Sequence, residues 1–200
     1  MKRYTQNEID KLANILKNDG VICVPTDTVY GICARINSEK ARDNLALVKN
    51  RPSSKSFAIM CADENQIKTI GIVNEKIEKL IYTFMPGPIT LILLKSPNVP
   101  AYINVNSPEI GVRMATSETL KDLIIKTGSP IFMTSANQSG ASTCTSLDEI
   151  EKNCPTLDGI MEGNVFFGKE STIVDCTSET FKILREGPIS MEQITKALEK

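Results

Sequence analysis

Short apolar runs alternate with helical patterns along most of the chain. Residues that can cap a helix stand before apolar residues spaced three and four apart. Thr5–Glu8 and Ser146–Glu149 also match a capping box, in which two side chains bond the first backbone amides of a helix. This spacing predicts helices over 5–20, 38–49, 63–70, 74–84 and 117–128, and others that begin at Ser146 and Ser190.

Between these helices lie apolar runs of strand length, bounded by Gly, Pro or polar residues. They predict strands over 21–25, 57–61, 89–94, 110–113, 130–133, 172–176 and 181–184. Several connections are too short for a crossover helix, so some neighbouring strands must pair antiparallel. The pattern therefore predicts one α/β (α+β) domain over residues 1–200, built around a twisted sheet of mixed parallel and antiparallel strands.

Composition narrows the chemistry that this domain can perform. The formal net charge is −1, which gives no global attraction to nucleic acid or to an acidic membrane. The N-terminus is polar, and no apolar run approaches the roughly 18 residues that span a bilayer, so we expect a cytoplasmic protein without a membrane partner. The six cysteines lie mostly in apolar runs, as small buried residues do. The chain has no histidine, which excludes Ser-His-Asp and Cys-His catalytic sites as well as zinc sites built from cysteine and histidine. We therefore predict no metal-ligating residues.

Polar residues follow the ends of four predicted strands. The four polar positions are 26–28, Arg113, 134–137 and 169–172. Ligands of open α/β sheets bind beyond strand ends, so these residues could converge on a pocket, although polar residues also mark ordinary turns.

Three cations lie close together at the end of the second helix, at Lys49, Arg51 and Lys55. Cations stabilise the C-terminus of a helix, which is one explanation. The other is a phosphate clamp, in which arginine and lysine bind anionic oxygens. The chain has no Walker motif and no Gly-x-Gly-x-x-Gly, so a nucleotide would be held by side chains. Residue chemistry by itself thus indicates an anion-binding pocket in a small α/β domain.

Seven motifs in a fixed order extend this interpretation. They are Pro25–Gly31 (PTDTVYG), Lys49–Pro52 (KNRP), Pro86–Leu91 (PGPITL), Gly111–Arg113 (GVR), Thr134–Gly140 (TSANQSG), Ser171–Asp175 (STIVD) and Ile183–Gly187 (ILREG). Together they resemble the YrdC-like threonylcarbamoyladenylate synthase family over about residues 5 to 190.

The resemblance implies a twisted open sheet with a basic concave cavity, and the short, single-domain form without the C-terminal domain of longer relatives. It also implies that L-threonine, bicarbonate and ATP, with Mg²⁺, give threonylcarbamoyl-AMP and pyrophosphate. A partner complex then transfers the threonylcarbamoyl group to a tRNA adenosine beside the anticodon, and weak binding to tRNA is a further expectation.

The resemblance also assigns residues. Lys49 and Arg51 correspond to the catalytic phosphate clamp. The full nucleotide-binding set is Lys49, Arg51, Ser53, Ser135, Asn137, Thr143 and Arg185. The threonine-binding set is Thr26, Tyr30, Arg113 and Ser171, with Arg113 suited to the carboxylate and Asp27 expected to orient the loop. On this view, alanine at Lys49 or Arg51 cripples ATP use and leaves the fold intact.

Two other functions stay open from the sequence. Proline is expected in the family where Ser56, Ala115, Ser142, Cys144 and Glu186 stand, which is compatible with a paralogue that acts on a different small molecule. A non-catalytic RNA-binding module is the second alternative. Near-zero net charge and the scarcity of aromatic residues argue against that module.

Overall fold

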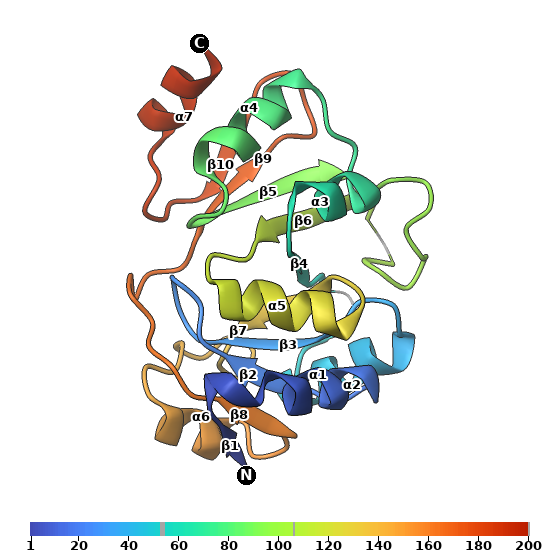
Figure 1. Ribbon diagram of the computed structural model, residues 1–200. Coiled ribbons are helices and arrows are strands. Elements are labelled where there is room, and N and C mark those ends of the chain that lie inside the picture. Colours follow the sequence, from blue (N-terminus) through green and yellow to red (C-terminus); the bar gives the residue numbers. More distant parts are fainter. Residues whose placement is uncertain (53–54, 106, 200) are drawn as a thin grey trace.

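The computed structural model describes residues 1–52, 55–105 and 107–199. These residues form one ten-stranded sheet with helices packed against it (Figure 1). In chain order the strands are β1 (Arg3–Tyr4), β2 (Ile22–Val24), β3 (Gly31–Arg35), β4 (Ala58–Cys61), β5 (Ile89–Leu94), β6 (Glu109–Met114), β7 (Ile131–Ser135), β8 (Gly159–Met161), β9 (Thr172–Asp175) and β10 (Lys182–Arg185). Their order in the sheet is β1-β8-β2-β3-β7-β4-β6-β5-β9-β10.

The sheet mixes the two strand directions, which confirms the predicted fold class. Strands β1 and β2 pair with β8 in parallel, as do β4 with β6 and β5 with β9. The remaining ladders, including β3 with β7 and β7 with β4, are antiparallel. Segments distant in the sequence therefore lie beside one another at the centre of the sheet.

Most predicted helices are present, and side chains cap them as expected. The helices are η1 (Gln6–Glu8, 3₁₀), α1 (Ile9–Lys17), α2 (Glu39–Lys49), α3 (Glu64–Ile70), α4 (Glu75–Phe84), α5 (Glu118–Thr127), α6 (Leu147–Asn153) and α7 (Met191–Leu198). The capping residues that accept a bond from the first turn are Ser38, Asp63, Asn74, Ser117, Ser146 and Ser190. None of the helices in the described part of the chain combines the length and the apolar character that crossing a bilayer requires.

Two details of the predicted caps differ in the structure. Thr5 caps the short 3₁₀ turn η1, and α1 starts after it. Glu149 bonds the backbone amide of Thr145 at 2.7 Å, one residue before the predicted partner Ser146. The first difference moves the start of α1 by about a turn, which spacing cannot resolve. The second leaves the start of α6 unchanged, because Ser146 still caps that helix.

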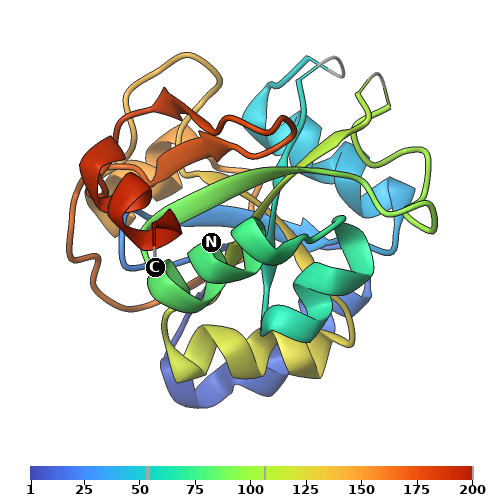
Figure 2. The same cartoon turned by 90° about the horizontal axis from the view of Figure 1, so that it is seen from above.

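Alternate residues of the central strands point into two hydrophobic cores, because successive side chains of a strand face opposite sides of a sheet. Ile22, Cys33 and Met60 pack in one core with α1 and α5. Cys23 and Ile32 pack in the other core, which includes residues of α2. Figure 2 shows α1 and α5 lying together on one side of the sheet.

The sequence pattern missed β1, β8 and most of β3. Strand β8 is only three residues long, between Asp158 and Glu162, so it shows no alternation. It is nevertheless buried, because it lies between β1 and β2. Tertiary pairing, and not local pattern, makes it a strand.

A buried hydroxyl closes the C-terminal part of the sheet. Thr172 Oγ1, on β9, donates to the carbonyl oxygen of Ile189 at 2.8 Å. It also accepts from the backbone amides of Gly187 at 3.1 Å and Ile189 at 3.0 Å. Gly187 lies so close to β9 that a Cβ there would stand 2.2 Å from the backbone nitrogen of Thr172. This contact fixes the position of the residues just before β9, which belong to the site described below.

We predict that Thr172→Val lowers the free energy of unfolding by about 3 kcal/mol, because it leaves buried backbone groups without partners. Thr83→Val, on the exposed face of α4, is the matched control and should change stability by no more than about 0.5 kcal/mol. Urea denaturation followed by circular dichroism measures both. Equal stability of the two variants would show that the Thr172 hydroxyl does not hold the segment.

Candidate active site

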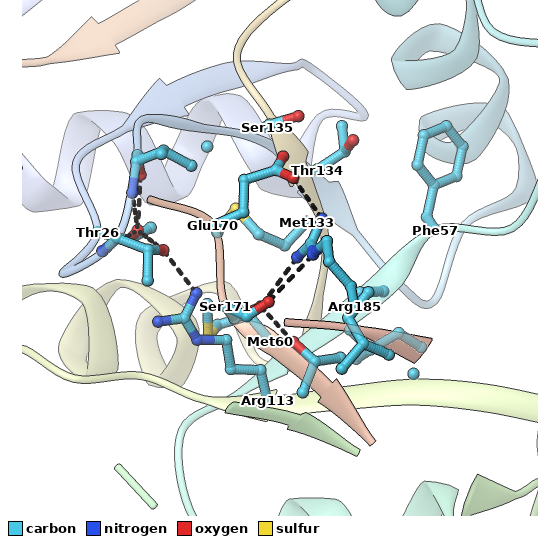
Figure 3. A pocket seen from close by; sticks show the side chains of 18 of the residues that line it. Thr26, Phe57, Met60, Arg113, Met133, Thr134, Ser135, Glu170, Ser171 and Arg185 are labelled. Carbon is cyan, nitrogen blue, oxygen red and sulfur yellow. Dashed lines mark hydrogen bonds and ion pairs between the residues drawn. The ribbon is translucent and has the colours of Figure 1, made fainter. Parts of the chain in front are cut away.

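A cavity of about 390 Å³ opens on the sheet surface (Figure 3). Strand register explains which residues line it. Arg113 lies opposite Met60, Gly111 opposite Ile92, Ala58 opposite Met133, and Gly31 opposite Ser135. Residues opposite one another share a face of the sheet, so β3, β7, β4, β6 and β5 all contribute to one floor.

Small residues keep this floor hollow. A Cβ at Gly111 would lie 3.2 Å from the Ile92 side chain and 3.6 Å from those of Ala58 and Thr90. A Cβ at Gly31 would lie 2.3 Å from the Met133 sulfur. Larger residues at these two positions would therefore fill the cavity or displace its wall.

Arg113 joins the floor of the cavity to the segment after β2. Its Nε donates to the Gly87 carbonyl oxygen at 3.2 Å and its Nη1 to Thr28 Oγ1 at 2.8 Å. Its Nη2 forms an ion pair with Asp27. Burial lowers the pKa of Arg113, and the Asp27 carboxylate offsets part of that effect. A guanidinium carries five N–H groups, so two are left to face a ligand.

Asp27 performs the orienting role that the sequence suggested. One of its oxygens pairs with Arg113. The other oxygen, Oδ2, is buried and has no hydrogen-bond partner among the described residues. The backbone carbonyl of Asp27 accepts from the amides of Phe166 and Phe167, which fastens the loop between β8 and β9 to this segment.

The hydroxyl of Thr26 is already occupied. Its Oγ1 donates to the carbonyl oxygen of Val29 at 2.6 Å and accepts from the amides of Thr28 and Val29, both at 3.2 Å. It also lies 3.0 Å from Thr28 Oγ1. A hydroxyl has one donor and two acceptor positions, so none remains for a ligand. Thr26 lines the cavity, but its hydroxyl shapes the turn.

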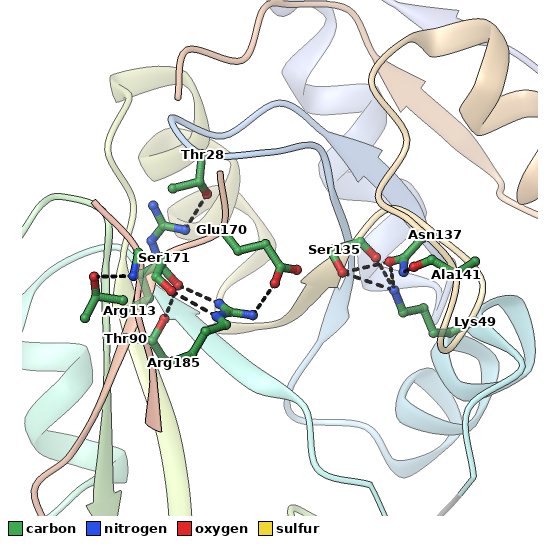
Figure 4. A network of polar contacts seen from close by, with 12 residues as sticks. Thr28, Lys49, Thr90, Arg113, Ser135, Asn137, Ala141, Glu170, Ser171 and Arg185 are labelled. Carbon is green, nitrogen blue, oxygen red and sulfur yellow. Dashed lines mark hydrogen bonds and ion pairs between the residues drawn. The ribbon is translucent and has the colours of Figure 1, made fainter. Parts of the chain in front are cut away.

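A second polar cluster lies across β5, β9 and β10. Ser171 Oγ is 2.9 Å from Thr90 Oγ1 and accepts from Arg185 Nη2 at 3.2 Å. Arg185 Nε donates to the Ser171 carbonyl oxygen at 3.0 Å, and its Nη1 donates to Glu170 Oε2 at 2.5 Å. Figure 4 shows this cluster beside Arg113. Arg185 is thus held in place and still reaches the cavity.

Lys49 lies behind the cavity wall. Only 2% of its surface is exposed, and it is not among the residues that line the cavity. Its ammonium donates to the carbonyl oxygen of Ser135, to Asn137 Oδ1 and, at 3.4 Å, to Ser135 Oγ (Figure 4). Burial, with the nearby Arg51 cation, lowers the pKa of Lys49 to about 8. In this structure the lysine holds the segment that follows β7.

Arg51 lies on the cavity wall itself. Its Nη2 donates to the Ser56 carbonyl oxygen at 2.6 Å, and its guanidinium carbon is 5.0 Å from the centre of the Phe57 ring. Burial lowers the pKa of Arg51. Because arginine stays protonated, this wall presents a positive charge to the cavity.

The structure brings together most, but not all, of the predicted site residues. Those that line the cavity are Thr26, Arg51, Arg113, Ser135, Ser171 and Arg185. Asn137 lies behind the wall with Lys49, and its amide donates to the Ala141 carbonyl oxygen at 2.5 Å. Thr143 does not line the cavity, and Ser53 lies outside the described residues.

Tyr30 does not line the cavity either. Its side chain is buried and its hydroxyl donates to the Gly163 carbonyl oxygen at 2.8 Å. It fastens the start of the loop between β8 and β9 to β3. Any effect of Tyr30 on a ligand is therefore transmitted through that loop.

Sequence reasoning assigned no individual role to several residues that line the cavity. Phe57, Met60, Thr90 and Met133 are among them. Thr28, Thr134 and Glu170 were noted only as members of polar strand ends. Glu170 is the carboxylate in the lining set, beside three arginines. Its place in the polar strand end 169–172 was the only signal for it, whereas the two methionines look like ordinary core residues in the sequence.

The cysteines and acidic residues offer no resident metal site in the described part of the chain. All six cysteines are buried and free of disulfides, as their apolar surroundings predicted. No group of three or more Cys, Asp or Glu side chains among the described residues is arranged to hold a metal ion.

Comparison with known proteins places this site in a family. The family model described as telomere recombination, for Sua5, YciO and YrdC, matches residues 14–187. A Methanocaldococcus jannaschii protein, provisionally named threonylcarbamoyl-AMP synthase, is 33% identical over 98% of this chain and 96% of its own length. The threonylcarbamoyl-AMP synthase of Pyrococcus abyssi is 31% identical over 98% of this chain, which spans 59% of that protein.

Solved structures of similar proteins support the same family. Pyrococcus abyssi Sua5 complexed with L-threonine superposes with a TM-score of 0.91 at 30% identity, over 98% of this chain and 60% of that one. Escherichia coli YciO gives a TM-score of 0.86 at 25% identity, over 96% of this chain and 98% of its own. The family model covers most of the sequence and the fold matches throughout, so the chain belongs to the Sua5/YciO/YrdC family.

Proposed function

We propose that this protein is an L-threonylcarbamoyladenylate synthase, which converts L-threonine, bicarbonate and ATP to threonylcarbamoyl-AMP and pyrophosphate. The observation that carries the proposal is the cavity lining, in which Arg51, Arg113 and Arg185 surround hydroxyl groups on one face of the sheet. Its volume of about 390 Å³ falls in the usual range for small-molecule sites. Relatives with the synthase name, and a relative's structure with L-threonine, support the choice of substrates.

The two ends of the cavity suit the two substrates. The cluster of Arg113, Thr90 and Ser171 offers a cation and hydroxyls for the carboxylate and hydroxyl of threonine. Arg51 and Ser135, on the opposite side, offer donors for the phosphates. Arg185 lies between Ser171 and Glu170 and would contact the group that joins the two halves.

The chemistry fits a site without histidine. The carbamate of threonine is an anion, so it can attack the α-phosphate of ATP without a further base, and pyrophosphate leaves. The cations neutralise the charge of the transferring group, and the rigid floor aligns the reactants. Held side chains of this kind supply electrostatic stabilisation without reorganising during the reaction.

Mg²⁺ would arrive with the nucleotide. It binds mainly through phosphate oxygens and water, so it does not require an acidic cluster, and none is found among the described residues. When bound, the ion neutralises phosphate charge.

We also propose that the product passes to a partner complex in the cytoplasm, which transfers the threonylcarbamoyl group to a tRNA adenosine beside the anticodon. Acyl-adenylates hydrolyse in water, so the cell needs a nearby consumer. Weak direct binding of tRNA belongs to the same proposal.

The first test is substrate dependence. Purified protein with ATP, Mg²⁺ and bicarbonate should release pyrophosphate only when L-threonine is added, and should form threonylcarbamoyl-AMP detectable by mass spectrometry. Serine, which lacks the methyl group of threonine, and valine, which lacks its hydroxyl, are the matched controls, and alanine lacks both groups. Turnover with another amine alone would identify a paralogous carbamoyl-adenylate enzyme. No adenylate with any amine, together with RNA binding, would favour the RNA-binding module.

The second test separates Arg51 from Lys49. Arg51→Ala should raise the KM for ATP about 10- to 100-fold, the loss expected for one or two charge-assisted bonds, with little change in stability. Lys49→Ala should also lower the free energy of unfolding by about 2–4 kcal/mol, because it leaves buried oxygens without a donor. This revises the expectation from sequence that the fold stays intact at both positions.

ATP titration and urea denaturation of the two variants measure these effects. Unchanged ATP use in Arg51→Ala would refute the phosphate contact. A stable Lys49→Ala protein that has lost ATP binding would show instead that the lysine reaches the phosphates directly.

The third test is the titration of Lys49. Its pKa of about 8 lies below the usual value for lysine, so we expect its Cε signal in carbon-detected NMR to titrate with a midpoint near pH 8. Above that pH the neutral amine binds Asn137 and Ser135 more weakly, and the amide signals of residues 135–137 should shift with the same midpoint. A midpoint at the usual value for a lysine would contradict the buried setting of Lys49.

A further inference from the structure

This inference rests on the proposed reaction. Formation of the carbamate releases a proton, and the mechanism given above does not say which group accepts it. Bicarbonate takes up one proton and loses water to give carbon dioxide. The threonine nitrogen forms a bond to that carbon and loses two protons in becoming a carbamate. One proton is therefore left over for each turnover, and some group must remove it from the nitrogen before the nitrogen can attack.

Few groups around the cavity can accept a proton. The chain has no histidine, and the arginines of the lining stay protonated. Lys49 lies behind the wall with its ammonium bound to oxygens. Asp27 is outside the lining set, and its Oδ2 is buried beside the Arg113 ion pair. Among the residues that line the cavity in the described part of the chain, Glu170 is the one carboxylate.

The structure holds Glu170 in a suitable position. Its Oε2 accepts from Arg185 Nη1, and its hydrogen bonds to described residues involve that oxygen only. The backbone near Glu170 is held in two places. The Gly168 amide donates to the Thr28 carbonyl oxygen, and Gly187 packs so closely that a Cβ there would lie 2.6 Å from the Glu170 carbonyl oxygen. Figures 3 and 4 both show the Glu170 side chain between Ser171 and Ser135.

Glu170 also lies between the two proposed substrate halves and can exchange protons with solvent. The residue that follows it, Ser171, is in the predicted threonine set, whereas Ser135 is in the predicted nucleotide set. The Glu170 side chain is 37% exposed, so a proton that it accepts can pass to water. The Arg185 cation against Oε2 orients the carboxylate and leaves Oε1 for the cavity.

We propose that Glu170 is the catalytic base of carbamate formation. It takes one proton from the ammonium of threonine and passes it to solvent. The nitrogen lone pair then forms the bond to carbon dioxide, and the second proton that leaves the nitrogen balances the one that bicarbonate takes up when it loses water. Glu170 takes no part in the later attack on the α-phosphate, because the carbamate is already an anion. The two half-reactions should therefore respond differently when the carboxylate is removed.

The test uses Glu170→Gln, whose amide oxygen can still accept from Arg185. In the forward direction, with L-threonine, bicarbonate, ATP and Mg²⁺ at pH 7, pyrophosphate release should fall about 100-fold, a typical loss for a general base. The deficit should narrow at pH 9, where more of the amine is already free. In the reverse direction, formation of ATP from threonylcarbamoyl-AMP and pyrophosphate should stay close to the wild-type rate.

Two further variants serve as controls. Glu186→Gln removes the same charge from an exposed residue next to Arg185 and should keep both rates. Glu170→Asp keeps a carboxylate and should recover part of the forward rate. The reverse assay also reports whether each variant is folded.

Each outcome decides the proposal. An unchanged forward rate in Glu170→Gln would overturn it. Equal losses in both directions, or a loss reversed by added Mg²⁺, would show that Glu170 serves the nucleotide or its metal and would also overturn it. A wild-type protein without threonine-dependent turnover would refute the proposed function itself, and this inference with it.

Discussion

The buried ion pair between Arg113 and Asp27 is the interaction on which the architecture of the site depends. It joins β6 to the connection between β2 and β3, although β7 and β4 lie between them in the sheet. A buried guanidinium requires partners for its charge and its donors, and Asp27, Thr28 and the Gly87 carbonyl oxygen accept from three of its five N–H groups. Breaking such a pair from one side typically costs about 3–5 kcal/mol. The ion pair therefore holds together two segments that are separated by two strands, and Arg113 and Thr28 both line the cavity.

The polar side chains around the cavity fall into two groups: those that bind other parts of the protein and those that are free to bind a ligand. Lys49 and the Thr26 hydroxyl are committed to backbone and loop contacts. Arg51, Arg185 and Glu170 reach the cavity and keep capacity for a ligand. Within one motif, one residue therefore holds the backbone in place while its neighbour faces the ligand. In this way a short polar segment can contribute to both stability and binding.

The sequence predicted the helices, the mixed sheet and six of the lining residues, because capping, periodicity and motif order are local signals. It did not predict β8, whose three residues become a strand only between β1 and β2. The phosphate contact of Lys49 stays a prediction, but the burial of Lys49 was not foreseen, because a sequence shows the charge of a lysine and not its burial. Met60 and Met133 reach the cavity through cross-strand register, and register between distant strands has no signature in one sequence.

A structure of the protein with L-threonine and a non-hydrolysable ATP analogue tests the central claim most directly, namely that the Arg113 side of the cavity holds the amino acid and the Arg51 side holds the phosphates. The account predicts threonine in contact with Arg113 and Ser171, and phosphate oxygens within hydrogen-bond distance of Arg51, with the Arg113–Asp27 pair intact. Threonine bound elsewhere, or phosphates on Arg113 in place of Arg51, would contradict it.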